Sequence, residues 1–157
     1  GWGKTTLLRI LMGLDTPTAG RVRGVGRAAA VFQEDRLCPQ LTALQNVTLV
    51  LPGSEKQYKE QIGADFQQLG MDAAALALPA ARLSGGQKRR TALLRALWAP
   101  SDTLLLDEPF TGMDPGTLSA AAALLRRRCT EKPVLLATHD REAIRLLGWP
   151  VLELETL

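Results

Sequence analysis

The sequence contains few aromatic residues, cysteines and histidines. Only 4% of its 157 residues are aromatic, and it has two cysteines, Cys38 and Cys129, and one histidine, His139. The cysteines stand far apart, outside any Cys-x-x-Cys or Cys/His spacing, which excludes a zinc site and favours a reducing compartment. The sequence has neither a signal-peptide pattern nor an apolar run of the ~20 residues that a membrane-spanning helix needs. We therefore expect that the chain does not itself cross a membrane.

The overall charge is mild. The net charge is +3, with 46% hydrophobic and 22% charged residues, which is typical of a folded globular domain. This balance gives no argument for a nucleic-acid partner. The densest basic run, Arg126–Arg128, suits the end of a helix, where cations oppose the helix dipole.

A glycine pair precedes an apolar helical pattern in Leu83-Ser84-Gly85-Gly86-Gln87. Ser84 is a natural N-cap residue, and the two glycines leave backbone N–H groups unshielded. A helix that begins there presents free donors and a partial positive charge, which suits a phosphate group.

Two adjacent carboxylates, Asp107 and Glu108, follow the apolar run Leu104–Leu106 and precede Pro109. The run predicts a strand buried on both faces of a parallel sheet. Because side chains alternate along a strand, we expect the two carboxylates to point to opposite sides. One can then hold a metal ion while the other faces a water molecule.

The chain begins with Gly1-Trp2-Gly3-Lys4-Thr5-Thr6, which matches the last residues of the phosphate-binding loop G-x-x-x-x-G-K-[ST]-T. An apolar helical stripe follows it, as that motif requires. In such a loop the lysine reaches the β- and γ-phosphates, and the next hydroxyl coordinates Mg²⁺.

Together these motifs resemble the ATP-binding cassette ATPases, because Leu83–Gln87 is identical to their signature motif and lies about twenty residues before Asp107-Glu108-Pro109. The resemblance implies an α/β fold, a P-loop NTPase core with a mostly parallel sheet plus a small helical subdomain. It also implies one domain over residues 1–157, with the core at 1–33 and 84–157 and the helical subdomain at about 40–83.

The resemblance implies ATP and Mg²⁺ as cofactors and assigns roles to particular residues. The nucleotide-binding residues would be Gly1, Trp2, Gly3, Lys4, Thr5, Thr6, Ser84, Gly85, Gly86, Gln87 and Asp114. The Mg²⁺ ligands would be Thr5, Gln33 and Asp107. The catalytic residues would be Glu108, His139 and Gln33.

The family pattern also implies an antiparallel β-subdomain and a loop-bearing strand before Gly1, and the sequence lacks both. We expect the absent strand to be central, beside the strands that end at Asp107 and Thr138, so that both would have an unpaired edge. One interpretation is therefore a truncated fragment with impaired ATP binding.

The family resemblance implies that the chain powers solute transport across a membrane. The segment Phe32–Val47, which reads Phe-Gln-Glu-x-Arg-Leu-x-Pro followed by Leu-Thr-Ala-Leu-x-Asn-Val, resembles the nitrate/sulfonate/taurine group of bacterial importers. The implied partners are a second nucleotide-binding domain, as a homodimer or a pair, transmembrane permease subunits and an extracytoplasmic substrate-binding protein, with no nucleic acid. The implied location is peripheral, at the cytoplasmic face of the cell membrane.

A non-transport relative acting on ribosomes or DNA is the remaining alternative. About fifty residues separate Gln33 from Leu83, which is too short for the coiled coil of DNA-repair relatives.

Local patterns predict the remaining elements. We predict short strands at about 21–23 and 28–32, a further buried strand at 133–138 and a terminal strand at 151–155. We predict helices over about 42–51, 55–69, 70–79, 87–98, 115–129 and 141–147.

Overall fold

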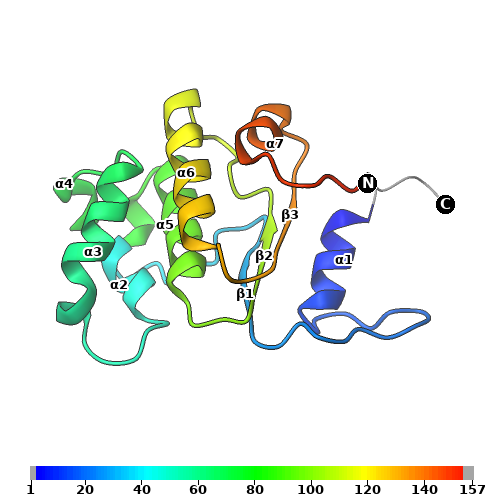
Figure 1. Ribbon diagram of the computed structural model, residues 1–157. Coiled ribbons are helices and arrows are strands. Elements are labelled where there is room, and N and C mark those ends of the chain that lie inside the picture. Colours follow the sequence, from blue (N-terminus) through cyan, green and yellow to red (C-terminus); the bar gives the residue numbers. More distant parts are fainter. Residues whose placement is uncertain (1–2, 154–157) are drawn as a thin grey trace.

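The computed structural model describes residues 3–153, and the ends 1–2 and 154–157 lie outside the description (Figure 1). Three strands alternate with helices along the chain. In order, the elements are α1 (Lys4–Leu11), β1 (Ala28–Val31), α2 (Ala43–Thr48), α3 (Glu55–Gln68), α4 (Ala73–Leu76), the 3-10 turn η1 (Ala80–Arg82), α5 (Gly85–Trp98), β2 (Thr103–Asp107), α6 (Pro115–Arg128), β3 (Val134–Ala137) and α7 (Arg141–Leu147).

The three strands form one parallel sheet in the order β1-β2-β3. Val31 of β1 is in register with Leu106 of β2, which is in register with Leu136 of β3. All five residues of the central strand β2 are buried. Both faces of this sheet are covered by helices, which explains the continuous run of leucines. The predicted α/β fold with a parallel sheet is confirmed.

The leucines of β2 face two different layers. Leu104 and Leu106 belong to the large core that includes residues of α5, α6 and α7, whereas Leu105 packs with Leu8 of α1 and Ala137 of β3. Alternation along the strand therefore attaches α1 to one face and the other helices to the opposite face. Figure 1 shows α1 on one side of the sheet and α5 and α6 on the other.

Helices α2, α3 and α4 lie beyond α5, at the end of the molecule away from α1 (Figure 1). Both α2 and α3 pack on α5. The buried carboxylate of Asp65 on α3 accepts hydrogen bonds from Trp98 at the end of α5 and from Arg128 at the end of α6. These contacts tie the helical end of the molecule to the helices that cover the sheet.

Two of the predicted strands are wrong. Residues 21–23 form no strand, because Gly20, Gly24 and Gly26 have φ angles of 82°, 81° and 61° and turn the chain around the sheet instead. The terminal strand predicted at 151–155 does not form at 151–153, and its last two residues lie outside the described part.

The predicted unpaired edge of Leu104–Leu106 is also wrong. These residues pair with β1 on one side and β3 on the other, so β2 is the central strand. Within residues 3–153 the outer edge of β3 has no partner strand, and Leu135 there is 37% exposed. A groove of about 480 Å³ runs along this edge between α1 and α7.

Among residues 3–153, every helix is too short or too polar to span a bilayer.

Candidate functional site

Helix α1 begins with a backbone conformation that exposes its first N–H groups. Gly3 is the N-cap residue with φ 77°, in the left-handed region, and no side chain caps the helix. Leu8 is 1% exposed and anchors the helix on the sheet. The exposed side chains of Thr5 and Thr6 stand in the first turn beside Lys4. An uncapped helix start with a lysine suits an anion. Gly1 and Trp2, also predicted here, lie outside the described residues.

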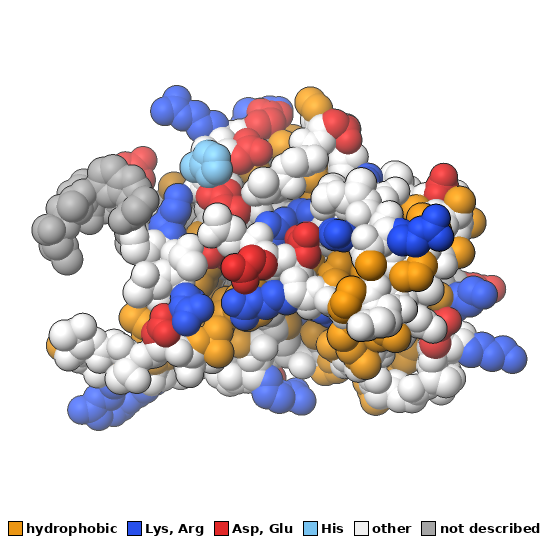
Figure 2. Space-filling view, turned by 180° about the vertical axis from the view of Figure 1, so that it is seen from behind, with side chains coloured by type: hydrophobic (Ala, Val, Ile, Leu, Met, Phe, Trp, Pro, Cys, Tyr) orange, Lys and Arg blue, Asp and Glu red, His pale blue; other side chains and the backbone are white. Residues whose placement is uncertain are grey.

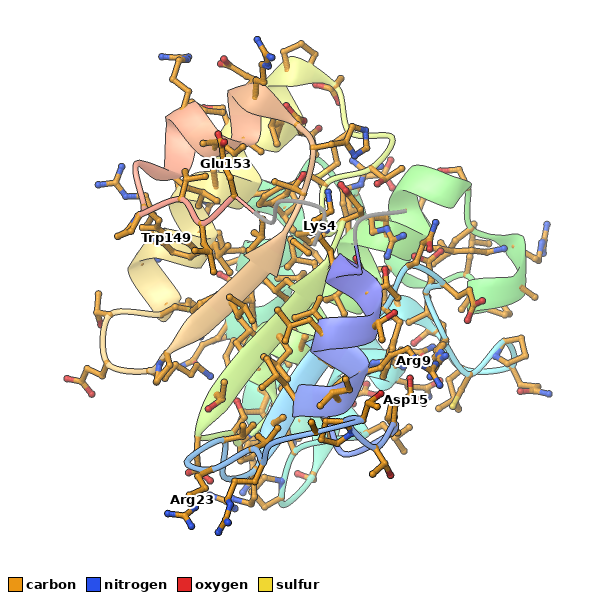
Figure 3. All side chains as sticks on the ribbon, turned by 90° about the vertical axis from the view of Figure 1, so that its right-hand side faces the viewer. Lys4, Arg9, Asp15, Arg23, Trp149 and Glu153 are labelled. Carbon is orange, nitrogen blue, oxygen red and sulfur yellow. The ribbon has the colours of Figure 1, made fainter. Side chains whose placement is uncertain are left out.

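Glu108 lies directly after β2 and is held by the segment that follows β3. Its Oε2 accepts a hydrogen bond of 2.9 Å from the Thr138 hydroxyl, and its Oε1 lies 2.7 Å from Nδ1 of His139. The ammonium of Lys4 lies 4.0 Å from the same Oε1. Figure 3 shows Lys4 at the end of α1, next to the end of the sheet. The structure therefore brings together Lys4, Glu108 and His139, which are far apart in the sequence.

The backbone of Glu108 departs from the predicted strand alternation. The strand ends at Asp107, and Glu108 has φ 47°, in the left-handed region that non-glycine residues seldom occupy. Its N–H donates to the carbonyl of Ala137 at 2.9 Å, which keeps it against β3. The turn, and not alternation, therefore sets the direction of the Glu108 side chain. Strained conformations of this kind often occur at functional sites.

Asp107 and Thr5 provide oxygen donors that fit a magnesium ion. Asp107 is the last residue of β2 and is 5% exposed, at the same end of the sheet as Glu108. No group of three or more His, Cys, Asp and Glu side chains suited to a metal occurs in the described part of the chain. Mg²⁺ is usually bound through one or two carboxylates plus substrate phosphates and waters, so a carboxylate and a hydroxyl suit it.

His139 stands on the surface, with its side chain 81% exposed. In Figure 2, acidic side chains lie beside the single histidine. The Thr138 hydroxyl that donates to Glu108 also accepts a hydrogen bond of 3.1 Å from the N–H of Asp140, the N-cap residue of α7. The start of α7 thereby orients Thr138 toward Glu108. Sequence reasoning did not select Thr138, because its partner Glu108 lies 30 residues away in the chain.

Gln33 follows β1 and has an exposed side chain. Because the sheet is parallel, the carboxyl ends of β1, β2 and β3 lie on the same side of the molecule, so that Gln33 follows the strand end on the side where Glu108 and His139 follow theirs. Two arginines of α5, Arg89 and Arg95, donate hydrogen bonds to backbone carbonyls of residues 32–36. Sequence reasoning missed both arginines, because their partners lie more than fifty residues away.

Ser84 and Gln87 cap the start of α5. The Ser84 hydroxyl accepts from the Gln87 N–H at 3.3 Å, and the Gln87 side-chain oxygen accepts from the Ser84 N–H at 2.9 Å. A Cβ added to Gly85 would meet no atom within 4 Å, so the helix start is open to the outside. Within residues 3–153, no hydrogen bond or ion pair joins Ser84–Gln87 to Lys4, Glu108 or His139. The starts of α1 and α5 therefore make no direct polar contact with each other in the described part of the chain.

Asp114 is the N-cap residue of α6. Its carboxylate accepts hydrogen bonds from the hydroxyl and the N–H of Thr117, at 2.6 and 3.0 Å. The Thr117 hydroxyl, followed by the N–H, holds the pKa of Asp114 below its ordinary value. The side chain is exposed and serves α6 in this chain, and its predicted role toward a nucleotide remains a prediction.

Comparison with known proteins gives consistent matches. The family model described as "ABC transporter" matches residues 1–111. The aliphatic sulfonates import ATP-binding protein SsuB 1 of Rhodococcus jostii (strain RHA1) is 43% identical over 160 residues, covering 97% of this chain and 63% of the relative. SsuB 3 of Nocardia farcinica (strain IFM 10152) is 43% identical over 150 residues, covering 94% of this chain and 60% of the relative. The chain thus spans about three fifths of the length of these curated relatives.

Solved structures show the same architecture. The dimeric post-hydrolysis state of the ATP-binding cassette MJ0796, bound to ADP and Pi, superposes with a TM-score of 0.77 at 27% identity. That alignment covers 92% of this chain and 73% of the other. RNase-L Inhibitor superposes with a TM-score of 0.74 at 24% identity, which supports the fold alone.

Proposed function

Because the chain belongs to the ABC transporter family, we propose that it is the ATP-binding and ATP-hydrolysing part of a membrane transporter, of the importer type. One observation carries this proposal. Lys4 from the start of α1, Glu108 just after β2 and His139 just after β3 lie together where the strands end at their carboxyl ends. These are the groups that phosphoryl transfer to water requires, a phosphate-binding cation beside groups that can position a water molecule.

The start of α1 would hold the phosphates. The free N–H groups of the first turn, the dipole of the helix and the ammonium of Lys4 all favour a polyanion. In the described structure Lys4 lies near Glu108, and a bound phosphate would compete for that ammonium. Lys4 would then stabilise the charge that develops on the transferred group.

Glu108 would orient the attacking water or accept a proton from it. Both carboxylate oxygens are held, one by the Thr138 hydroxyl and the other by His139 Nδ1. This arrangement fixes the plane of the Glu108 carboxylate, so that Glu108 does not have to change its rotamer to orient a water molecule. His139, whose ring is exposed, would contact the terminal phosphate, and Gln33 would complete the water site from the segment after β1.

Asp107 and Thr5 would hold Mg²⁺, together with Gln33. When bound, the ion would neutralise phosphate charge and fix the geometry of the transferred group. Asp107 is buried and is the last residue of β2, at the end of the strand that Glu108 follows.

The open start of α5 supports a paired assembly. A Cβ on Gly85 would meet open space, and within the described residues Ser84–Gln87 shares no hydrogen bond or ion pair with Lys4, so we assign it to the phosphates of a nucleotide bound by a second copy or a paired domain. Asp114 would lie at the same contact. Permease subunits, a substrate-binding protein and a place at the cytoplasmic face of the cell membrane complete the proposal. The names of the relatives favour an aliphatic sulfonate as the transported solute.

Equilibrium binding of a fluorescent ATP analogue tests the site. Lys4→Met removes the only ammonium placed near Glu108 in the described structure, and we expect it to raise the Kd about 10-fold or more. Lys56→Met, on the exposed face of α3, is the matched control and should bind as the wild type does. In the absence of Mg²⁺, Asp107→Asn should bind nucleotide with the wild-type Kd. Adding Mg²⁺ should not lower its Kd as it does that of the wild type. Equal Kd values for wild type and Lys4→Met would contradict the assignment.

A further inference from the structure

Arg89 of α5 is a buried arginine that reaches the segment after β1. Its side chain is 8% exposed. One guanidinium nitrogen, Nη1, donates to the Phe32 carbonyl at 2.6 Å, and the other, Nη2, donates to the Gln33 carbonyl. Nη1 also lies 3.4 Å from Oδ1 of Asp35. A single side chain thus binds two consecutive carbonyls and lies beside the carboxylate of Asp35, two residues further along the chain.

This contact fixes the backbone that carries Gln33. A buried guanidinium is costly unless its donors are satisfied, so moving either carbonyl away from Arg89 would leave a buried donor unpaired. The planar fork of arginine donates to both carbonyls at once, which a single ammonium cannot reproduce with the same geometry. The Gln33 side chain is exposed and remains free to reach a ligand.

Arg95, six residues further along α5, binds the next part of the same segment. Its guanidinium donates to the carbonyls of Arg36 at 2.8 Å and Asp35 at 3.1 Å. Arg95 therefore supports the segment without touching Gln33. The contact to the Gln33 backbone belongs to Arg89.

Arg89 also lies close to the start of its helix. Ser84 caps α5, and Arg89 stands in the second turn after it. A helix transmits a displacement of its first turn to its second turn with little loss, because the backbone hydrogen bonds keep it rigid. A ligand that contacts Ser84–Gln87 can therefore move the Gln33 backbone through Arg89.

We propose that Arg89 is a positioning residue for ATP hydrolysis, which holds Gln33 in place and links it to the Ser84–Gln87 end of α5. This inference rests on the proposed function, since it assigns Gln33 a part in the water site. It concerns a residue whose guanidinium binds backbone carbonyls, so its effect on hydrolysis is exerted through Gln33.

A double-mutant cycle tests the proposal. Arg89→Met, which keeps the length of the side chain but no donors, should lower kcat for MgATP about 10-fold or more while KM changes less than about twofold. Gln33→Ala should lower kcat by a similar factor, and the double variant should be no slower than Gln33→Ala alone. Arg89→Lys should fall between wild type and Arg89→Met.

The matched control is Arg90→Met. Arg90 is the next residue of α5 and also donates to two backbone carbonyls, those of Gly86 and Leu69, at 3.1 and 2.9 Å, outside the Gln33 segment. Its effect on kcat should combine with that of Gln33→Ala multiplicatively. An Arg89→Met effect that persists at full size in the Gln33→Ala background would overturn the proposal, as would an unchanged kcat in Arg89→Met.

Hydrogen exchange separates this proposal from the proposed function. In Arg89→Met the amides of a peptide covering residues 29–38 should exchange about 10-fold faster, and in Arg90→Met at the wild-type rate. Unchanged exchange in Arg89→Met would overturn the positioning role even if the wild type hydrolyses ATP. Absence of turnover in the wild type would count against the proposed function, while the exchange result would still decide whether Arg89 holds the segment.

Discussion

Asp65 offers the most direct test of how the helical end is fastened to the rest of the molecule. Its side chain is 5% exposed and accepts hydrogen bonds from Trp98 Nε1 at 2.9 Å, from Arg128 at 2.5 Å and from Arg127 at 3.3 Å. The Arg128 guanidinium also lies 4.0 Å from the centre of the Trp98 ring. One carboxylate of α3 thus holds the ends of α5 and α6.

The expected cost of Asp65→Ala follows from these contacts. Removing one partner of a buried ion pair costs about 3–5 kcal/mol, and an unsatisfied buried donor about 1–3 kcal/mol. Arg128 is 28% exposed and Arg127 58% exposed, so water can rehydrate both cations in part. We therefore expect a loss of about 3 kcal/mol, at the low end of the ion-pair range. Asp65→Asn, which can still accept from Trp98, should lose about half as much.

Urea unfolding, followed by far-UV circular dichroism and by tryptophan fluorescence, measures this loss. With an m-value of about 2 kcal/mol/M, the midpoint of Asp65→Ala should fall by about 1.5 M. Arg127→Ala is the control, because an ion pair of an exposed arginine contributes about 0–1 kcal/mol. A midpoint for Asp65→Ala within about 0.3 M of the wild type, or an equal loss in Arg127→Ala, would refute the reasoning.

Three further changes have defined outcomes. Gly26→Ala should destabilise the fold by about 1–3 kcal/mol in thermal or urea unfolding, because φ is +61° and the new Cβ would lie 2.8 Å from Asp102. Gly24→Ala, with φ +81° and no atom within 4 Å, should lose less stability. A larger loss in Gly24→Ala than in Gly26→Ala would refute the clash. Above about pH 4, Asp114→Ala should melt at a lower temperature than the wild type. This difference in melting temperature should disappear as the pH falls through the depressed pKa of Asp114, because the protonated carboxyl no longer caps α6 as a carboxylate. A difference that does not change with pH would contradict this. Gly85→Ala should keep the wild-type unfolding midpoint, because its Cβ meets open space, but it should weaken the MgATP-dependent pairing of two chains measured by light scattering. Gly63→Ala, where a Cβ also meets open space, should leave pairing unchanged. Unimpaired pairing in Gly85→Ala would argue against the paired site.

Local chemistry made most elements predictable. Ser84, Asp114 with Pro115, and Asp140 each mark a helix start by capping, and α5, α6 and α7 begin at the next residue. The leucine run of β2 indicated a strand buried on both faces, and all five of its residues are buried. The strand predicted at 133–138 forms as β3, but it is not fully buried, because it lies at the side of the sheet and Leu135 is exposed there.

The remaining features depend on contacts between distant segments. Nothing near Arg89 in the sequence indicates the carbonyls of Phe32 and Gln33, which are more than fifty residues away. The left-handed backbone of Glu108 arises where its N–H meets the Ala137 carbonyl, a partner set by the sheet register. The position of β2 between β1 and β3 likewise follows from the whole sheet, and the apolar pattern of one strand cannot reveal its neighbours.

The central claim is that Glu108, held by Thr138 and His139 beside Lys4, activates water for ATP hydrolysis. The most direct measurement is steady-state phosphate release from MgATP by the chain and by its Glu108→Gln variant, with ATP binding measured on both. The account predicts turnover in the wild type and a loss of about 100-fold or more in Glu108→Gln with binding retained. Equal turnover in the two proteins would contradict it.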